Sequence, residues 1–312
     1  MTWVAWRLHR VQLLIAGAFA VAVVGTMSAT GTSGAWVQED GLRGLVIVTL
    51  YALPGAAGII MGTTITARER ERLTSRLVWT QGVSRTRWLL SSLWPVALVG
   101  AIGVGAVSAV ATWWVDAVHL GTRVQSTPFD ISGVVPVAYF LGALALGVLA
   151  GTFLRAEGLA GAVAIVAIVA SRVVVRSDVR AHLAPVSHQA LSTAPLFDLG
   201  PIWSSVPGTS ALQHSWVVAQ GFVAVGRTSP LPGHRWLQVD VLYNRCPSMT
   251  HAAQVPHDWI GACAASLHLH YVAAYQPLGH YWLLQAGEAG IFVAGAAAAI
   301  GVAVLLLRRS SE

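Results

Sequence analysis

Histidine and cysteine, the residue types best suited to metal binding or hydrolytic chemistry, gather in one segment of this sequence. Residues 177–280 hold nine of the eleven histidines and both cysteines. His268 and His270 share one face of an alternating run, a spacing that places two metal ligands side by side. However, the sequence has no Cys-x-x-Cys, His-Glu-x-x-His or Gly-x-Ser-x-Gly motif. We therefore favour surface or core histidines over a metal site, with no catalytic group.

Cys246 and Cys263 have only one possible intramolecular pairing. Disulfides persist outside the cytoplasm, which is where we expect this segment to lie. We expect a disulfide, and two buried free thiols are the alternative.

The densest charge lies in residues 67–88, which read ARERERLTSRLVWTQGVSRTRW and contain six arginines. A stretch this charged must lie in water, and the positive-inside rule makes that water the cytoplasm. As a helix it has an apolar stripe and arginines at positions 68, 72 and 76 in i, i+4 spacing. Gly82 interrupts this helix, and Ser84 suits the N-cap of a second one.

The composition indicates an integral membrane protein. Hydrophobic residues make up 55% of the 312 residues, charged residues only 10%, and the mean hydropathy is +0.64. All 19 basic residues are arginine. Without lysine the chain cannot form a nucleotide-binding P-loop, so any ATP must be bound by another polypeptide. The net charge of +6 reflects arginines that flank membrane spans, and we expect no nucleic-acid partner.

Apolar stretches of about 20 residues predict six transmembrane helices with both termini in the cytoplasm. They lie at about 11–29, 44–67, 88–115, 131–154, 158–175 and 281–307. An outer loop covers residues 116–130, and residues 155–157 form an inner turn. Eleven of the nineteen arginines fall in the 38 residues assigned to the inner side.

The fifth span is short, because only fourteen residues separate Glu157 from Arg172. It is needed because Arg308 and Arg309, after the last span, belong on the same side as residues 67–88. We expect Arg172 to extend its side chain toward the outer interface.

Residues 176–280 predict an extracytoplasmic domain of mixed or β-rich structure between spans five and six. Residues 1–175 form the first five spans, and 281–312 the last span with a cytoplasmic tail. The apolar runs in the predicted domain are short, at 216–225, 236–242 and 267–272. The last run alternates, with Leu267, Leu269 and Tyr271 on one face, which predicts a strand.

Two stretches resemble a family of actinobacterial ABC exporter permeases of the type-2 class. The first is residues 67–88, with its acidic-basic helix start, a Thr, a Trp-Thr-Gln triplet and an Arg-x-Arg-Trp ending. The second is YQPLGHYWLLQAGEAGIF, residues 275–292. The family has a small-Ser-Arg triplet after the Pro, where this sequence has Leu278, Gly279 and His280.

The resemblance implies that residues 67–88 form the coupling helix that sits in a groove of a separate ATP-binding subunit. A solvated loop that only sets the topology is the alternative. Carried over by position, the implied coupling residues are Arg68, Glu69, Arg70, Glu71, Arg72, Thr74, Arg76, Trp79, Thr80, Gln81, Gly82, Arg85, Arg87 and Trp88.

Gln285 and Glu288 lie near the outer start of the last span and match the family's Gln and Glu. An ionisable group there is costly unless it is paired or faces a cavity. We expect Glu288 to line the substrate path or to lock the outer domain to the helices. An interfacial residue in contact with water is the alternative.

The sequence therefore predicts the permease subunit of an ABC exporter, multi-pass in a bacterial cell membrane and surrounded by lipid. It binds no cofactor itself, since ATP and Mg belong to the ATP-binding subunit. A second copy or a sister permease completes the path, and the cargo is amphipathic or hydrophobic. The alternative is a membrane-anchored enzyme or sensor that acts through the His-rich outer domain.

Overall fold

The structure is a computed structural model of the 312-residue chain. It describes residues 17, 21–29, 31, 40–71, 85–118, 120–154, 156–191, 212, 214–227, 245–246 and 259–309. The chain forms two compact units, residues 1–180 with 283–312, and residues 181–282.

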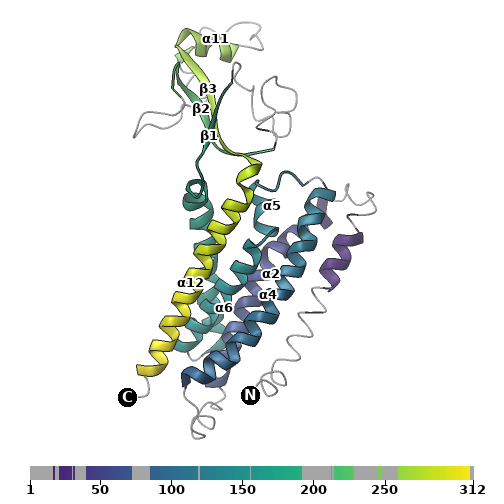
Figure 1. Ribbon diagram of the computed structural model, residues 1–312, viewed down its shortest axis with the longest axis vertical. Helices are drawn as coiled ribbons and strands as arrows, with labels where there is room; N and C mark the ends of the chain where they lie inside the picture. Colours follow the sequence, from purple (N-terminus) through teal and green to yellow (C-terminus); the bar gives the residue numbers. More distant parts are fainter. Residues whose placement is uncertain are drawn as a thin grey trace. The chain divides into compact units, whose positions relative to one another are not determined.

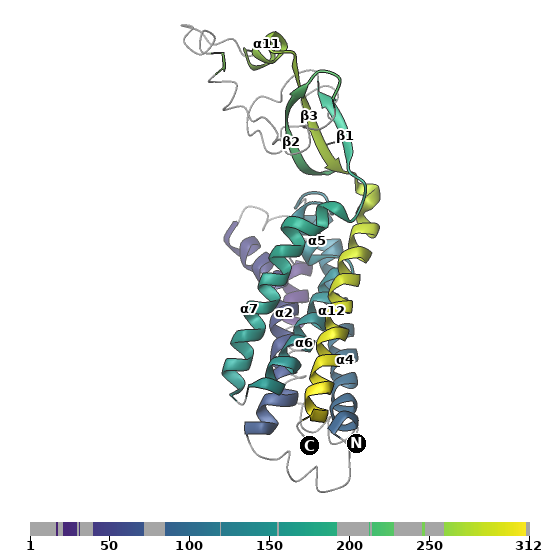
Figure 2. The same cartoon turned by 90° about the vertical axis from the view of Figure 1, so that its left-hand side faces the viewer.

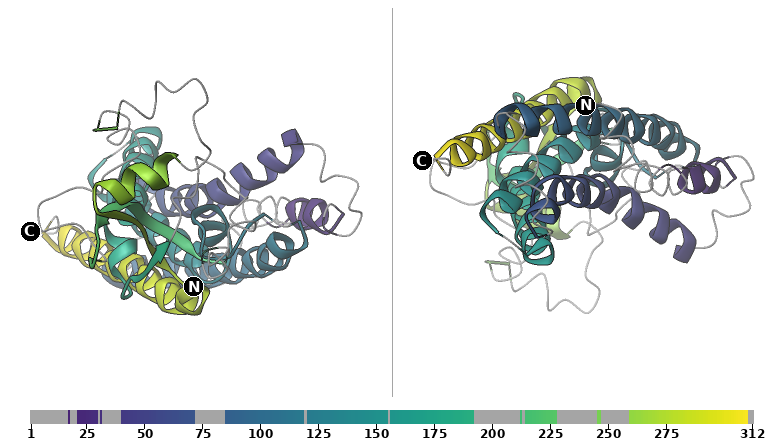
Figure 3. Two further views of the ribbon diagram at one scale, coloured as in Figure 1. Left: turned by 90° about the horizontal axis from the view of Figure 1, so that it is seen from above. Right: turned by 90° about the horizontal axis from the view of Figure 1, so that it is seen from below.

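The first unit is a helical bundle (Figures 1 and 2). Its long helices are α2 (Asp40–Glu71), α4 (Arg85–Ala117), α6 (Val135–Phe153), α7 (Glu157–Val174) and α12 (Tyr281–Arg309). A short helix, α5 (Ser126–Ile131), precedes α6, and α7 continues through a π-helical turn, η2 (Val175–Val179), into a 3-10 turn, η3 (Arg180–His182). In Figure 3, α12 and the helical residues 21–29 lie at opposite sides of the bundle.

Five helices among the described residues are long and apolar enough to cross a membrane. They cover Gly41–Thr66, Thr86–Ala117, Val135–Phe153, Glu157–His182 and Leu278–Arg309. These correspond to predicted spans two to six. Nine of the nineteen residues of predicted span one lie outside the described residues, so six spans and the topology stay predictions.

Three expectations about the fifth span and the charged residues near it are wrong. The span is not short, because the helical run continues from Glu157 to His182 over 26 residues. Arg172 does not extend to the interface, since it is only 7% exposed. Asp130, expected in an outer loop, instead lies in α5 and is buried. Arg172 and Asp130 are buried because both find polar partners on other helices, the Tyr51 carbonyl and the Arg180 guanidinium.

Close packing of α2 against α6 depends on glycines. A Cβ added at Gly62 would lie 2.3 Å from the carbonyl oxygen of Leu144, and one at Gly58 2.5 Å from that of Phe140. From the α6 side, a Cβ added at Gly147 would lie 3.0 Å from the carbonyl oxygen of Ile59 on α2. Small residues four apart allow two backbones to approach in this way. The Thr66 hydroxyl also donates to the carbonyl of Val148 on α6, at 3.2 Å.

Two apolar cores hold the other helices of this unit together. One joins residues 23 and 27 with α2, α4 and α5 around the fully buried Trp114. The other joins α2, α4, α6 and α12 around Phe140, Leu144 and Leu89. On α12 the buried residues recur every three or four positions, which is the spacing of one helix face: Tyr281, Leu284, Gln285, Glu288, Phe292, Ala299, Ala303 and Leu307.

The second unit contains a three-stranded antiparallel sheet of β1 (Ser187–Leu191), β2 (Trp216–Ala224) and β3 (Leu269–Gln276), with β3 in the centre. A helix, α11 (Trp259–Ser266), precedes β3. The predicted strand 267–272 begins two residues later than expected and runs four residues further. Its beginning shifts because His268 adopts a positive φ of 53° in the preceding turn.

The face predicted to be apolar does line the core of this unit. Leu267, Leu269 and Tyr271 pack with Phe222 and the two cysteines. The rings of Phe222 and Tyr271 meet edge to face, with centroids 5.1 Å apart. Burial raises the pKa of the Tyr271 hydroxyl to about 12. The predicted strand at 236–242 lies outside the described residues.

The α2–α6 packing predicts that Gly62→Ala destabilises the protein by about 1–3 kcal/mol, because its Cβ meets backbone that cannot move aside. Gly55→Ala is the matched control on the same helix, where an added Cβ meets nothing within 4 Å. This control is expected to be neutral or stabilising by up to about 1 kcal/mol. Thermal unfolding of the purified proteins in detergent measures both changes. Equal melting temperatures for the two variants would contradict the packing.

Candidate functional site: a buried charged cluster between four helices

A guanidinium shared by two carboxylates lies inside the helical unit. Nε and Nη2 of Arg180 bond the two carboxylate oxygens of Glu288, at 2.7 and 3.0 Å. Nη2 also pairs with Asp130. None of the three side chains is more than 1% exposed. Two N–H groups on two carboxylate oxygens make a bidentate pair, the strongest common geometry for arginine.

Aromatic side chains complete the surroundings of this pair. The hydroxyl of Tyr139 on α6 donates to Glu288 at 2.5 Å and lies 3.3 Å from Asp130. The Arg180 guanidinium lies over the ring of Phe129, 4.3 Å from its centroid. Arg176, whose side chain is 42% exposed, approaches Asp130 at 3.5 Å. The cluster thus ties α5, α6, α12 and the end of α7 together.

Gln285, one turn before Glu288 on α12, satisfies four backbone groups. Its Oε1 accepts from the N–H groups of Val134 and Val135 at 2.9 Å each. Its Nε2 donates to the carbonyls of Phe129 and Ser132 at 3.1 and 3.2 Å. These groups belong to the end of α5 and the start of α6, where helix ends leave polar groups without helical partners.

The turn between α5 and α6 is also bonded by α4. Gly133 has a positive φ of 73°, which glycine adopts readily. Its carbonyl accepts from the Ser108 hydroxyl at 2.7 Å, and its N–H donates to Thr112 Oγ1 at 3.2 Å. Irregular backbone among apolar helices requires such partners, because no lipid group can replace water.

Arg172 occupies a neighbouring position, between two aromatic rings. Its guanidinium carbon lies 3.8 Å from the centroid of Tyr51 and 4.0 Å from that of Tyr139. Its Nη1 donates to the Tyr51 carbonyl at 2.8 Å. Pro54, three residues further along α2, has no N–H and disturbs the helical hydrogen bonds of the preceding turn. The carbonyl that Pro54 leaves without its helical donor is that of Leu50, and Arg172 bonds the next carbonyl along the chain, that of Tyr51.

The arginines come together because of the helix that carries them. Arg172, Arg176 and Arg180 are four residues apart, and on an α-helix such residues drift slowly around the axis, since a turn takes 3.6 residues. The wider turn of η2 opposes this drift. As a result, Arg172 and Arg180 both contact Tyr139.

The predicted gate residues Gln285 and Glu288 lie in this one site, so two residues chosen from the sequence are neighbours in space. Both are fully buried, which differs from the interfacial alternative. The described partners of Glu288 are Arg180 and Tyr139, in the helical unit. Whether Glu288 lines a substrate path stays a prediction.

The sequence analysis missed the cluster residues Asp130, Tyr139, Arg176 and Arg180, and it placed the neighbouring Arg172 at the interface. A signal for Arg172 was present. The buried residues of α7 are Ala160, Ala164, Ile168 and Arg172, so the arginine continues a stripe of residues four apart. No comparable pattern marks Asp130, because α5 is only six residues long.

The predicted coupling residues lie at the ends of two helices or outside the described residues. Arg68, Glu69, Arg70 and Glu71 form the last turn of α2, and Arg85 begins α4. Arg87 is exposed, while Trp88 is half-buried against the core of α2, α4, α6 and α12. The others lie outside the described residues: Arg72, Thr74, Arg76, Trp79, Thr80, Gln81 and Gly82.

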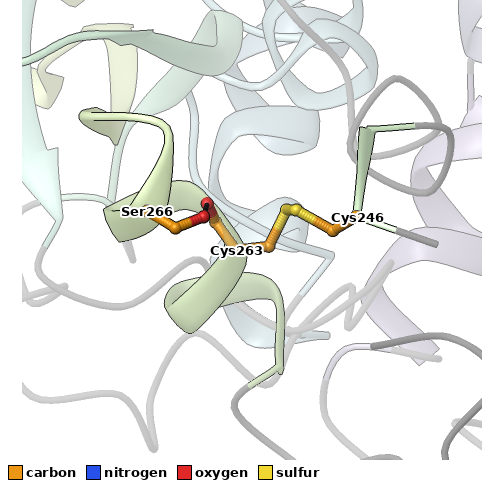
Figure 4. Close-up of a disulfide and its surroundings, with 3 residues drawn as sticks. All are labelled: Cys246, Cys263 and Ser266. Atoms are coloured by element: carbon orange, nitrogen blue, oxygen red, sulfur yellow. Dashed lines mark hydrogen bonds between the residues drawn. A yellow bond between two sulfur atoms is a disulfide. The ribbon is translucent and has the colours of Figure 1, made fainter. Parts of the chain in front are cut away.

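In the second unit, Cys246 and Cys263 form the expected disulfide, with Cα atoms 6.1 Å apart (Figure 4). Ser266 donates to the Cys263 carbonyl at 2.7 Å, which holds the end of α11 beside the bridge. His268 is exposed. Among the described residues, no three His, Cys, Asp or Glu side chains lie close enough to hold a metal ion.

These long apolar helices, joined by a buried ionic cluster, define a multi-pass membrane protein. Residues 34–180, which include α2 to α7, match the model of the family described as ABC-2 membrane transporter related. This match supports an ABC-2 type permease and agrees with the resemblance seen in residues 67–88, whereas residues 275–292 lie outside the matched region. No curated protein and no solved structure matches the chain.

The ionic cluster predicts that Arg180→Met destabilises the protein by about 3–5 kcal/mol, because two buried carboxylates lose the buried guanidinium that they share. Arg123→Met is the matched control, since Arg123 pairs with Asp116 where both side chains are more than a third exposed. It is expected to cost about 1 kcal/mol or less. Thermal unfolding compares them. Adding Asp130→Asn and Glu288→Gln to Arg180→Met should restore part of the loss, and similar melting of Arg180→Met and Arg123→Met would refute the cluster's role.

The four bonds of Gln285 predict a distinct effect for Gln285→Glu. The carboxylate can still accept from Val134 and Val135, but it cannot donate to the carbonyls of Phe129 and Ser132. The expected loss is about 1–3 kcal/mol, the usual penalty for buried polar groups left without a partner. Gln125→Glu, at an exposed residue, is the control for the added charge. If Gln285→Glu and Gln125→Glu have the same melting temperature, Gln285 does not stabilise the α5–α6 turn.

Proposed function

We propose that the chain is the transmembrane subunit of an ATP-driven exporter, and that a separate subunit binds and hydrolyses the ATP. The match to the ABC-2 family and the five apolar helices support a transporter membrane subunit. The absence of lysine supports a separate ATP-binding chain, because a P-loop requires one. Coupling, export and the cargo are the proposed parts.

The observation that carries the coupling proposal is the uninterrupted helix α2. It runs from Asp40 to Glu71, so the charged turn Arg68–Glu71 belongs to the same helix as Gly58 and Gly62. Those glycines hold α2 directly against α6. Force applied at residues 68–71 is therefore delivered to α6 through a contact between backbones, without passing through flexible side chains.

The route continues from α6 to the charged cluster. Tyr139 on α6 bonds Glu288 of α12 and contacts both Arg172 and Arg180 of the α7 run. Tyr51 of α2 contacts Arg172 directly. In the proposed mechanism, ATP-driven closure of the partner subunits moves α2 with α6, and the cluster passes this movement to α7 and α12. The cluster then holds these helices together in one state and rearranges in another.

The start of α4 forms the second arm of the proposed coupling element. Helix α4 begins at Arg85, and Trp88 contacts the core shared with α2, α6 and α12. The residues between Glu71 and Arg85 would contact the ATP-binding subunit, and both flanking helices would respond together. A second copy or a sister permease would complete the transport path in the cell membrane.

An apolar cavity supports a hydrophobic or amphipathic cargo. Its volume is about 130 Å³, which suits an alkyl or ring group better than a whole cargo molecule. It lies between α2, α4 and α6 beside residue 17, and its other lining residues are Leu53, Ala57, Met61, Val99, Gly100, Gly103, Val104, Val107 and Phe140.

The coupling proposal predicts the effect of exchanging charges without changing their number. The variant Glu69→Arg, Arg70→Glu, Glu71→Arg and Arg72→Glu keeps the composition and net charge of the stretch. A loop that only sets the topology tolerates this exchange, because the positive-inside rule counts arginines. A coupling helix does not, because each charge then faces the wrong partner. We expect at least a roughly ten-fold loss of the co-purified ATP-binding subunit, which corresponds to about 1.4 kcal/mol.

The measurement is co-purification of the tagged chain from its native membrane in mild detergent, followed by ATPase assay of the complex. Arg309→Glu, a charge reversal at the end of α12, is the control. Unchanged co-purification and ATPase activity in the exchanged variant would refute coupling through this stretch. Function without any P-loop protein would favour the membrane-anchored enzyme or sensor instead.

A further inference from the structure

Arg172 has buried hydrogen-bond donors that the cluster does not use. The residue is 7% exposed and lies within a membrane-spanning helix. Its Nη1 donates to the Tyr51 carbonyl, but Nε and Nη2 are buried and donate to no acceptor among the described residues. Buried donors without partners are rare in folded proteins and need an explanation, especially on a charged group.

The two nitrogens form the edge of arginine that recognises oxyanions. Arg180, eight residues later, uses the same pair, Nε and Nη2, to hold both oxygens of Glu288. Arg172 therefore presents, beside that pair, a second fork of the same geometry. Parallel N–H groups at this spacing match a carboxylate or a phosphate.

The carboxylates near Arg172 already have other partners. Glu288 bonds Arg180 and Tyr139, and Asp130 pairs with Arg180 and Arg176. Asp178, on the same helical run, is exposed and accepts from Ser177. Three arginines thus face two buried carboxylates, and one positive charge in this region lacks an anion among the described residues.

The aromatic rings beside Arg172 orient its guanidinium, and exposed apolar residues of α7 lie nearby. Tyr51 and Tyr139 sandwich the guanidinium, which fixes its plane and favours the cation through their π faces. Tyr51 is only half-buried. Val169 and Val173, on the neighbouring face of α7, are 53% and 58% exposed. An apolar chain can lie along these valines, and its anionic head reaches the fork when a neighbouring side chain moves aside, because Nε and Nη2 are themselves buried.

We propose that Arg172 binds the oxyanion of an amphiphile, a carboxylate or phosphate attached to an apolar chain. Nε and Nη2 bond two oxygens of the anion, Tyr51 and Tyr139 position the guanidinium, and the exposed valines of α7 contact the apolar part. This site goes beyond the proposed transport function and does not require the ATP-binding subunit. The amphiphile is either a free molecule or an anionic membrane lipid.

The first arm of the test uses the purified full chain in an uncharged detergent. Decanoate and decanol share an apolar chain, but only decanoate carries an oxyanion. We expect decanoate to raise the melting temperature by a few degrees in a dose-dependent and saturable manner, because a ligand stabilises the state that binds it. Decanol should produce no such shift. Arg172→Lys, which keeps the charge without the fork, and Arg172→Gln should both lose most of it, whereas Arg176→Gln should retain it.

The second arm places the protein in nanodiscs of phosphatidylcholine with increasing phosphatidylglycerol. A shift in this arm alone assigns the site to a membrane lipid, and a shift with decanoate alone assigns it to a free amphiphile. Wild-type protein that responds in neither arm overturns the proposal. A melting-temperature shift in Arg172→Lys equal to that of the wild-type protein also overturns it. This variant remains informative if Arg172→Gln does not fold.

Discussion

The sharing of one buried guanidinium by two carboxylates is the interaction on which the helical unit depends. Arg180 has one charge, and Asp130 and Glu288 reach it from α5 and α12. Each ion would be very costly alone among apolar helices, so the three side chains exist in this environment only together. Because separating them is costly, the ion pairs fix the positions of α5, α7 and α12 relative to one another. The hydrogen bond from Tyr139 to Glu288 fixes α6 in the same arrangement. One turn away on the same face of α12, the uncharged side chain of Gln285 bonds backbone groups at the end of α5 and the start of α6.

The break between α5 and α6 imposes a second constraint, which the same helices satisfy. A helix that ends among apolar neighbours leaves N–H and carbonyl groups that lipid cannot bond. The side chains of Gln285, Ser108 and Thr112 supply the partners. The polar residues of α4 and α12 that look misplaced in apolar sequences are therefore the groups that permit the irregular turn. The charged cluster and this turn adjoin each other, so one interior region contains most of the polar contacts between described helices.

The sequence predicted the elements better than their polar contacts. Hydropathy located five of the spans, because twenty apolar residues are a strong local signal. The match of residues 275–292 to a family pattern also pointed to Gln285 and Glu288. Hydropathy failed for Arg172 and Asp130, since a charge in an apolar segment reads as interfacial unless its partner is known. Those partners are distant along the chain: Arg180 and Glu288 are 108 residues apart, and Arg180 and Asp130 are 50 apart. Pairing at such separations follows from packing, which hydropathy and motif spacing do not encode.

The glycine contact between α2 and α6 also limits the kinds of motion available to the protein. At Gly62 the partner backbone occupies the space of a Cβ, so sliding one helix along the other by a residue would drive a side chain into a carbonyl. Tilting or rotating the pair as one body encounters no such obstacle. The two helices are therefore expected to tilt or rotate together as a rigid pair and not to slide along each other. A displacement at one end of α2 must reappear on α6 as a change of angle, and even a small tilt is amplified with distance along the helix.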